Sequence, residues 1–140
     1  SDRDLDYGNL LGACRGGHGN PRRLQHCDTR KGSDPLLRNP AIHPPLVDRD
    51  LHYLADGSIG SDETEFDREL NEVLNLNLER LKNNRKAVLD GLKAWAERVD
   101  KLRKSDVRAE LREWNEMEDG VLREYAQVAI YWLNRRLARF

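Results

Sequence analysis

Residues 9–14 read Asn9-Leu10-Leu11-Gly12-Ala13-Cys14, and residues 26–32 read His26-Cys27-Asp28-Thr29-Arg30-Lys31-Gly32. After its asparagine the first run is short and apolar, as in a β-strand, and the second run places Gly32 where a short helix would end. The segment between them is rich in glycine, which indicates a loop. We therefore expect a strand, a loop and a short helix that bring an amide, a carboxylate and a lysine together.

The two cysteines, Cys14 and Cys27, are separated by twelve residues. A structural zinc site needs a tetrahedral set of ligands, which usually come as closely spaced cysteine pairs. The spacing here predicts either half of a zinc site, with its knuckle expanded by an inserted loop, or two thiols without a metal. If no ligand lies further upstream, His18 or His26 would have to complete the set.

Charge is distributed unevenly along the chain. The 140 residues carry a formal net charge of -1, which excludes a globally basic nucleic-acid binder. Residues 1–45 nevertheless hold seven Lys/Arg against five Asp, a local charge of +2 that leaves room for a basic face. No run approaches the roughly 20 apolar residues of a membrane span, and no signal-peptide pattern is visible, so the sequence predicts a cytoplasmic protein.

Turn-forming residues divide the sequence into two parts. All five prolines lie before residue 46, whereas the sequence after residue 61 is almost free of turn formers. Asp56-Gly57 separates two short stretches of strand character, which predicts a β-hairpin with a two-residue turn over residues 51–61.

From Glu65 onward the apolar residues recur at helical intervals, which predicts about four helices, one of them beginning after Ser105. The expected fold is α+β and mostly α. Residues 1–62 are expected to form the strand, loop and short helix, a proline-rich connection and the hairpin, and residues 63–140 are expected to form a helical region. The tryptophans of this region lie at helical spacing with aliphatic residues, which predicts core or partner-interface positions.

The ordered series of motifs resembles the HNH endonucleases of the PtuB family, which belong to the Septu and retron anti-phage systems. HNH nucleases share a ββα-metal finger with a histidine ending the first strand, an asparagine opening the second, and a histidine, asparagine or aspartate on the helix. The resemblance covers residues 5–100 and rests on these segments: Asp6-Tyr7-Gly8-Asn9-Leu10-Leu11, His26-Cys27-Asp28-Thr29-Arg30-Lys31-Gly32, Asn39-Pro40, Tyr53-Leu54-Ala55-Asp56-Gly57-Ser58-Ile59, Val73-Leu74-Asn75-Leu76-Asn77 and Leu81-Lys82-Asn83-Asn84-Arg85.

The resemblance implies a role for four residues. Asn9 is the middle residue of the HNH motif, and Asp28 holds the catalytic cation, Mg²⁺ or a similar divalent ion that takes oxygen ligands. Cys14 and Cys27 form one half of a structural Zn²⁺ site. The first histidine of the family pattern, its acidic neighbour and the other cysteine pair would precede Ser1, so we expect the 140-residue chain alone to be inactive or nearly so.

Four basic residues surround Asp28 in the sequence and are candidates to hold the phosphates of a nucleic acid, most readily DNA: Arg22, Arg23, Arg30 and Lys31. Contacts of this kind position a duplex without reading its sequence. Each residue also has a plainer interpretation. Asn9 is suited to capping a turn, Asp28 to the first turn of a helix, and the basic residues to ordinary solvated positions.

Two functions follow. The first is a metal-dependent HNH nuclease subunit that hydrolyses nucleic-acid phosphodiester bonds; the second is a non-catalytic, zinc-stabilised adaptor. In both, the helices bind a protein partner. The resemblance implies a PtuA-like ATPase, or a retron reverse transcriptase complex, and the exposed part of the apolar stretch over residues 121–140 is the expected contact.

Overall fold

The computed structural model describes residues 15–38 and 49–140. The chain forms two compact units. The first comprises Ser1–His52 together with Ile59–Glu79, and the second comprises Tyr53–Ser58 together with Arg80–Phe140. The boundary near Glu79 places the first helical segments after residue 62 in the first unit, whereas the sequence had grouped them with the helical region.

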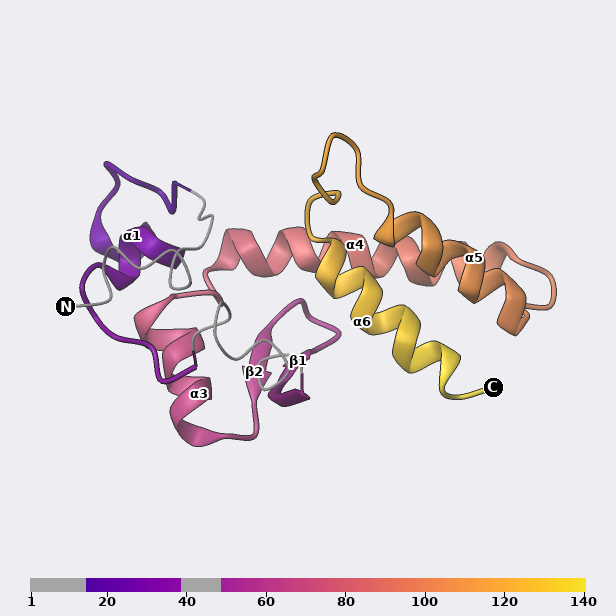
Figure 1. Cartoon of the computed structure of the whole chain (residues 1–140), viewed down its shortest axis with the longest axis horizontal. Helices are drawn as coiled ribbons and strands as arrows, with labels where there is room; N and C mark the ends of the chain where they lie inside the picture. The colour runs from indigo at the N-terminus through magenta and orange to yellow at the C-terminus, as the bar shows by residue number, and fades with distance from the viewer. Residues whose placement is uncertain (1–14, 39–48) are drawn as a thin grey trace. The chain divides into compact units, whose positions relative to one another are not determined.

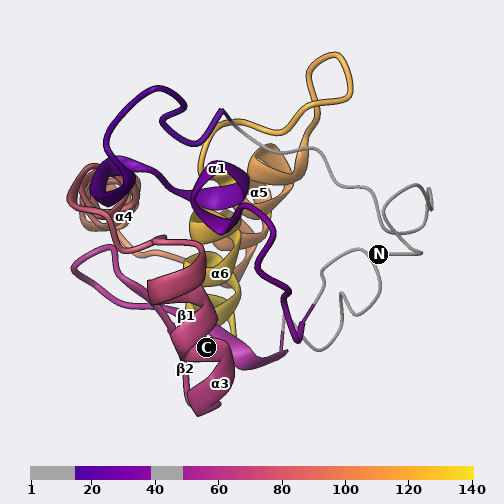
Figure 2. The same cartoon turned by 90° about the vertical axis from the view of Figure 1, so that its left-hand side faces the viewer.

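The first unit contains most of the two strands of a hairpin, whose turn belongs to the second unit, and one continuous helical segment. Strands β1 (Leu51–Tyr53) and β2 (Ile59–Ser61) form a two-stranded sheet. Helix α3 (Thr64–Arg68) continues directly into a π-helical turn, η3 (Glu69–Val73), and Figures 1 and 2 show α3 beside the hairpin. The apolar side chains that these elements bury are Ile59, Phe66, Leu70 and Val73.

Side-chain hydrogen bonds join the segment after η3 to β2, and η3 itself to the chain before β1. The Asn77 Oδ1 accepts from the Ile59 amide and its Nδ2 donates to the Ile59 carbonyl, both at 2.8 Å. The buried carboxyl group of Glu69 accepts a 2.5 Å hydrogen bond from the Leu37 amide through Oε1, while its Oε2 has no partner. Both contacts join segments far apart in the sequence, so they define how the first unit closes.

The hairpin lies where the sequence places it, but its turn is longer than the two residues predicted. The Leu54 amide donates to the Ser58 carbonyl at 2.9 Å, which leaves three residues in the turn. The Asp56 carboxylate accepts from the amide of Ser58 at 2.9 Å and from its hydroxyl at 2.6 Å. The Gly57 carbonyl accepts a 2.6 Å hydrogen bond from Arg85 Nε, so a residue far along the chain stabilises the wider turn.

The second unit is helical. It contains most of α4 (Glu79–Arg98), together with α5 (Lys104–Asn115) and α6 (Ala126–Leu137), and Figure 1 shows these helices lying alongside one another. Each helix contributes to one core of Leu92, Val107, Ala129 and Leu133. The partly buried side chains packed on this core include all three tryptophans of the chain, Trp95, Trp114 and Trp132.

The predicted fold class is confirmed at the level of a mostly helical chain with a small two-stranded sheet. Helix α5 begins at Lys104, slightly before the start expected after Ser105, because the Asp106 carboxylate accepts the Arg103 amide at 2.9 Å and closes the first turn. Within residues 15–38 and 49–140, no helix combines the length and apolar character needed to cross a membrane.

Candidate metal-binding knuckle

Residues 15–32, which we call the knuckle, fold back on themselves in the first unit. The His26 amide donates to the Gly16 carbonyl at 2.9 Å, and the Thr29 hydroxyl donates to the Arg15 carbonyl at 2.9 Å. Gly16 is buried with φ 57°, and a Cβ there would overlap the His26 carbonyl and approach Thr29 Cβ to 2.9 Å. Only glycine fits at this position, because any side chain would separate the loop from His26 and Thr29. The glycine-rich loop therefore packs directly against the residues that follow it.

The short helix predicted from the sequence is present as α1 (Cys27–Lys31). Gly32 ends it, with φ 56° and its amide donating to the Asp28 carbonyl at 2.9 Å. Asp28 lies in the first turn of α1 and is exposed to solvent. Its carboxylate is therefore accessible from outside the knuckle, as a ligand that shares a cation with a substrate must be.

Cys27 and His26 place two metal-binding side chains together. The Cys27 Sγ lies 3.3 Å from the His26 Nδ1, and His26 is 5% exposed while Cys27 is half-buried. A sulfur and a nitrogen bound to one tetrahedral zinc would be about 3.6 Å apart, so the spacing suits zinc ligands as well as an N–H···S hydrogen bond. Cys27 also has a φ of 53°, which is rare for a residue with a side chain and is typical of constrained functional positions.

The described residues alone do not complete a metal site. No group of three or more His, Cys, Asp or Glu side chains suited to a metal occurs within residues 15–38 and 49–140. His18 is exposed in the loop, and the structure does not bring it to Cys27 as part of such a group. Two of the predicted site residues, Asn9 and Cys14, lie outside the described residues.

The segment that follows η3 anchors the knuckle. The Cys27 amide donates to the Leu74 carbonyl at 2.8 Å. The Asn75 side-chain amide donates to the Gln25 carbonyl at 2.8 Å and to the Arg23 carbonyl at 3.3 Å. Asn75 adopts a left-handed φ of 50°, a conformation that asparagine tolerates better than most residues. Sequence reasoning assigned no role to Asn75, and its unusual backbone conformation is visible only in the structure.

The four predicted phosphate contacts differ in their availability. Arg30 Nη1 donates to the Arg22 carbonyl at 2.6 Å and Arg30 Nε donates to the Glu72 carbonyl at 3.4 Å, so Arg30 holds the knuckle together. Arg22 returns a weaker bond of 3.4 Å to the Arg30 carbonyl. Arg23 is exposed, and Lys31 is half-buried with its amine 3.1 Å from the Gly32 carbonyl. Arg22 and Arg23 are both exposed and are thus the more accessible cations.

Comparison of the chain with protein-family models, with curated proteins and with solved structures finds no match.

Proposed function

We propose that the chain is a metal-dependent HNH nuclease subunit of an anti-phage defence system and that it hydrolyses phosphodiester bonds in nucleic acid. The observation that carries the proposal is the closed knuckle, in which an exposed Asp28 directly follows a half-buried Cys27 with a left-handed backbone. This arrangement combines a thiol suited to a structural metal with a carboxylate suited to a hard cation. The two metals then have separate ligands on one short helix.

The structural Zn²⁺ would be held by Cys27 together with Cys14. Support comes from Arg15, which directly follows Cys14 in the chain and whose carbonyl accepts the Thr29 hydroxyl two residues beyond Cys27. Zinc binds the thiolate form of cysteine. The His26 Nδ1 at 3.3 Å from the Cys27 sulfur favours that form when it donates a proton to it.

Asp28 would hold the catalytic cation, Mg²⁺ or a similar ion, and Asn9 would position the scissile phosphate. A bound divalent cation would neutralise the negative charge that develops on the phosphoryl and leaving-group oxygens. Protein sites for Mg²⁺ often offer only one or two carboxylates, the remaining ligands being water and substrate phosphate. The single exposed carboxylate of Asp28 is compatible with that pattern.

Phosphates flanking the cleaved bond would be held mainly by the exposed Arg22 and Arg23, with Lys31 alongside. We assign Arg30 a positioning role instead, because its guanidinium group already donates to two backbone carbonyls. DNA is the favoured substrate. Binding through these cations should weaken as salt concentration rises, because phosphate contacts release bound counterions.

The helices would bind the protein partner, a PtuA-like ATPase or a retron reverse transcriptase complex. Two large apolar side chains on the segment between α5 and α6 support a contact there, since Met117 is 64% exposed and Val121 is 66% exposed. Exposed apolar side chains mark a protein interface where they form one contiguous patch, and Val121 belongs to the stretch over residues 121–140 that we expect to make this contact.

The test uses the protein expressed from its complete reading frame, with Asp28→Ala as the variant and Asp34→Ala, an exposed aspartate just after α1, as the matched control. Plasmid cleavage in Mg²⁺ should fall by roughly 10²-fold or more in Asp28→Ala, the scale of preorganised charge stabilisation, and should be unchanged in Asp34→Ala. Bound zinc, measured by mass spectrometry, should be lost in Cys27→Ser and retained in both aspartate variants.

The same samples separate the nuclease from the adaptor. A complete protein that binds zinc through Cys27 but cleaves no nucleic acid, alone or with its ATPase partner, would support the adaptor. Cleavage that persists at full rate in Asp28→Ala would remove Asp28 from the chemistry.

A further inference from the structure

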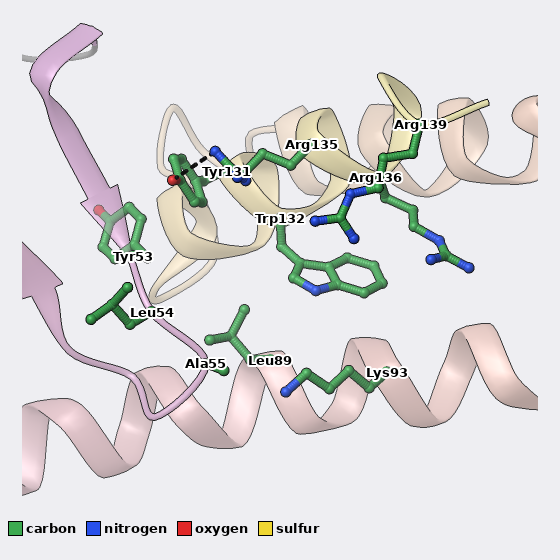
Figure 3. Close-up of a pocket in the computed structure, with 10 residues that line it drawn as sticks. All are labelled: Tyr53, Leu54, Ala55, Leu89, Lys93, Tyr131, Trp132, Arg135, Arg136 and Arg139. Atoms are coloured by element: carbon green, nitrogen blue, oxygen red, sulfur yellow. Dashed lines mark hydrogen bonds between the residues drawn. The ribbon is translucent and has the colours of Figure 1, made fainter.

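The second unit contains a pocket that the proposed nuclease function does not use. It lies between the hairpin turn, α4 and α6, is open to solvent and has a volume of about 130 Å³. This is smaller than the roughly 300–1,000 Å³ of sites that enclose a whole small molecule, so the pocket can hold one part of a ligand while the rest lies on the surface. Figure 3 shows the residues that line it, which are Tyr53, Leu54, Ala55, Leu89, Lys93, Tyr131, Trp132, Arg135, Arg136 and Arg139.

The pocket is strongly cationic. Lys93, Arg135, Arg136 and Arg139 all line it, and none of the described residues that line it is acidic. Lys93 is 3.9 Å from the Asp90 carboxylate, but no described carboxylate forms an ion pair with the three arginines. The Arg136 Nε is buried and has no hydrogen-bond partner. Its N–H group is therefore an unsatisfied hydrogen-bond donor that a bound ligand could use.

The end of α6 does not account for this charge by itself. Arg135 and Arg136 lie in its last turn, and Arg139 follows the helix. The C-terminus of a helix carries about half of a negative charge, which is too little to balance three guanidinium groups. A bound anion would supply the missing counter-charge.

Aromatic rings form the other part of the lining. The Tyr53 and Tyr131 rings pack edge to face with centroids 5.3 Å apart, and the Arg135 guanidinium lies 5.5 Å from the Tyr131 ring centroid. Figure 3 shows the Trp132 indole extending from α6 toward α4, with Lys93 reaching from the facing helix. Trp132 is half-buried, so part of the indole is accessible from the pocket. Such a surface can stack on a planar ring.

We propose that this pocket binds a nucleotide unit, with the base against Trp132 and the phosphate against Arg136 and Arg139. Arginine is suited to phosphate because its guanidinium group donates two parallel hydrogen bonds. The nucleotide unit is either a free nucleotide or part of a single-stranded nucleic acid. The inference is independent of the knuckle, because every residue lining the pocket belongs to the second unit.

Tryptophan fluorescence of the 140-residue chain tests the proposal, with AMP, ATP and a single-stranded oligothymidylate as ligands, and with adenosine and inorganic phosphate for comparison. Calorimetry on the same samples gives an affinity that does not depend on a fluorophore. The variants are Arg136→Gln and the solvent-exposed Arg139→Gln, and the control is Arg112→Gln, an exposed arginine of α5. Circular dichroism verifies that each variant is folded.

We expect saturable binding of AMP or of the oligonucleotide, and both should bind more tightly than adenosine or phosphate alone. Arg136→Gln and Arg139→Gln should each weaken binding on the order of tenfold, as expected for the loss of a hydrogen bond to a charged group, and Arg112→Gln should leave it unchanged. Binding of the oligonucleotide without AMP identifies a strand as the source, and the reverse identifies a free nucleotide.

Three results would overturn the proposal. The first is no saturable binding by either class of ligand. The second is equal affinity for inorganic phosphate and AMP, which would exclude a contact with the base. The third is equal binding of an acidic peptide such as polyglutamate, which would indicate a general docking surface for acidic proteins.

Discussion

Replacing Gly57 by alanine should destabilise the second unit far more than any other glycine substitution there. Gly57 lies in the hairpin turn with φ 86°, and a Cβ at this position would overlap the Lys82 carbonyl oxygen and approach the Lys86 amide nitrogen to 2.8 Å. Both atoms belong to the backbone of α4 and cannot move without breaking that helix. The turn must therefore withdraw from α4.

Two losses set the size of the effect. A left-handed backbone costs an alanine about 1–2 kcal/mol. Withdrawal of the turn also breaks the 2.6 Å bond from Arg85 Nε to the Gly57 carbonyl, at a side chain that is 6% exposed. Hydrogen bonds to charged groups contribute about 1.5–3 kcal/mol. The free energy of unfolding should fall by about 3–5 kcal/mol in total.

Urea denaturation followed by tryptophan fluorescence is a suitable assay, because all three tryptophans belong to the second unit. Two other glycines separate the contributions. Gly120 has φ 76° with open space around its Cβ position, so Gly120→Ala should lose only the backbone cost of about 1–2 kcal/mol. Gly91 lies within α4 with nothing near its Cβ position, so Gly91→Ala should gain about 0.5–1 kcal/mol.

A cost for Gly57→Ala no greater than that for Gly120→Ala would refute the predicted clash with α4. That result would mean that the turn accommodates a side chain without leaving α4. An Arg85→Met variant supplies a further check, because it removes the same hydrogen bond without changing the turn. Its effect should not add fully to that of Gly57→Ala, since the two changes break one contact.

Three further predictions concern both units. Leu133 is completely buried in the helical core, so Leu133→Ala should cost about 2–5 kcal/mol in the same urea assay, whereas the exposed Val121→Ala should change little. The pKa of Asp50 is lowered to about 2, first by its hydrogen bond from Arg49. Because the folded-state pKa of Asp50 is depressed, its ionised carboxylate stabilises the folded state above about pH 4, and this stabilisation is lost as the pH falls toward 2. NMR titration of the Asp50 carboxyl group should give this low midpoint, and Arg49→Gln should raise the midpoint. Asn75→Ala removes two hydrogen bonds to the knuckle, so the Cys27 amide should exchange with deuterium at least about tenfold faster, while Asn83→Ala on the exposed face of α4 should have no effect.

The helices and the hairpin could be predicted because their signals are local. Apolar residues at helical spacing mark α4, α5 and α6, and Asp56-Gly57 marks the turn. The length of that turn could not be predicted, since Arg85 holds it from 28 residues away. In the same way, the anchor of the knuckle depends on Asn75, which contacts backbone carbonyls 50 and 52 residues earlier in the chain.

The candidate site could be predicted only in part. The helix of residues 27–31 and its end at Gly32 follow from the sequence, because the stop signal is a single residue. The sequence predicts Arg30 as a phosphate contact, but its guanidinium group donates to two backbone carbonyls instead. This could not be foreseen, because one of the two acceptors lies 42 residues away. The basic pocket was missed for a related reason. Three of its four cations lie together in residues 135–139, but Lys93 and the hairpin-turn residues of the lining are far away in the sequence, so the sequence does not show that they border one cavity.

The buried carboxyl group of Glu69 has a practical consequence for engineering this chain. It is 1% exposed and uses one oxygen to accept the Leu37 amide while the other remains unsatisfied. A glutamine would retain the acceptor for Leu37 but would place two N–H donors at the position of the unpartnered Oε2, and a buried donor without an acceptor costs about 1–3 kcal/mol. Variants made for crystallography should therefore keep Glu69 and change exposed side chains away from the knuckle and the pocket.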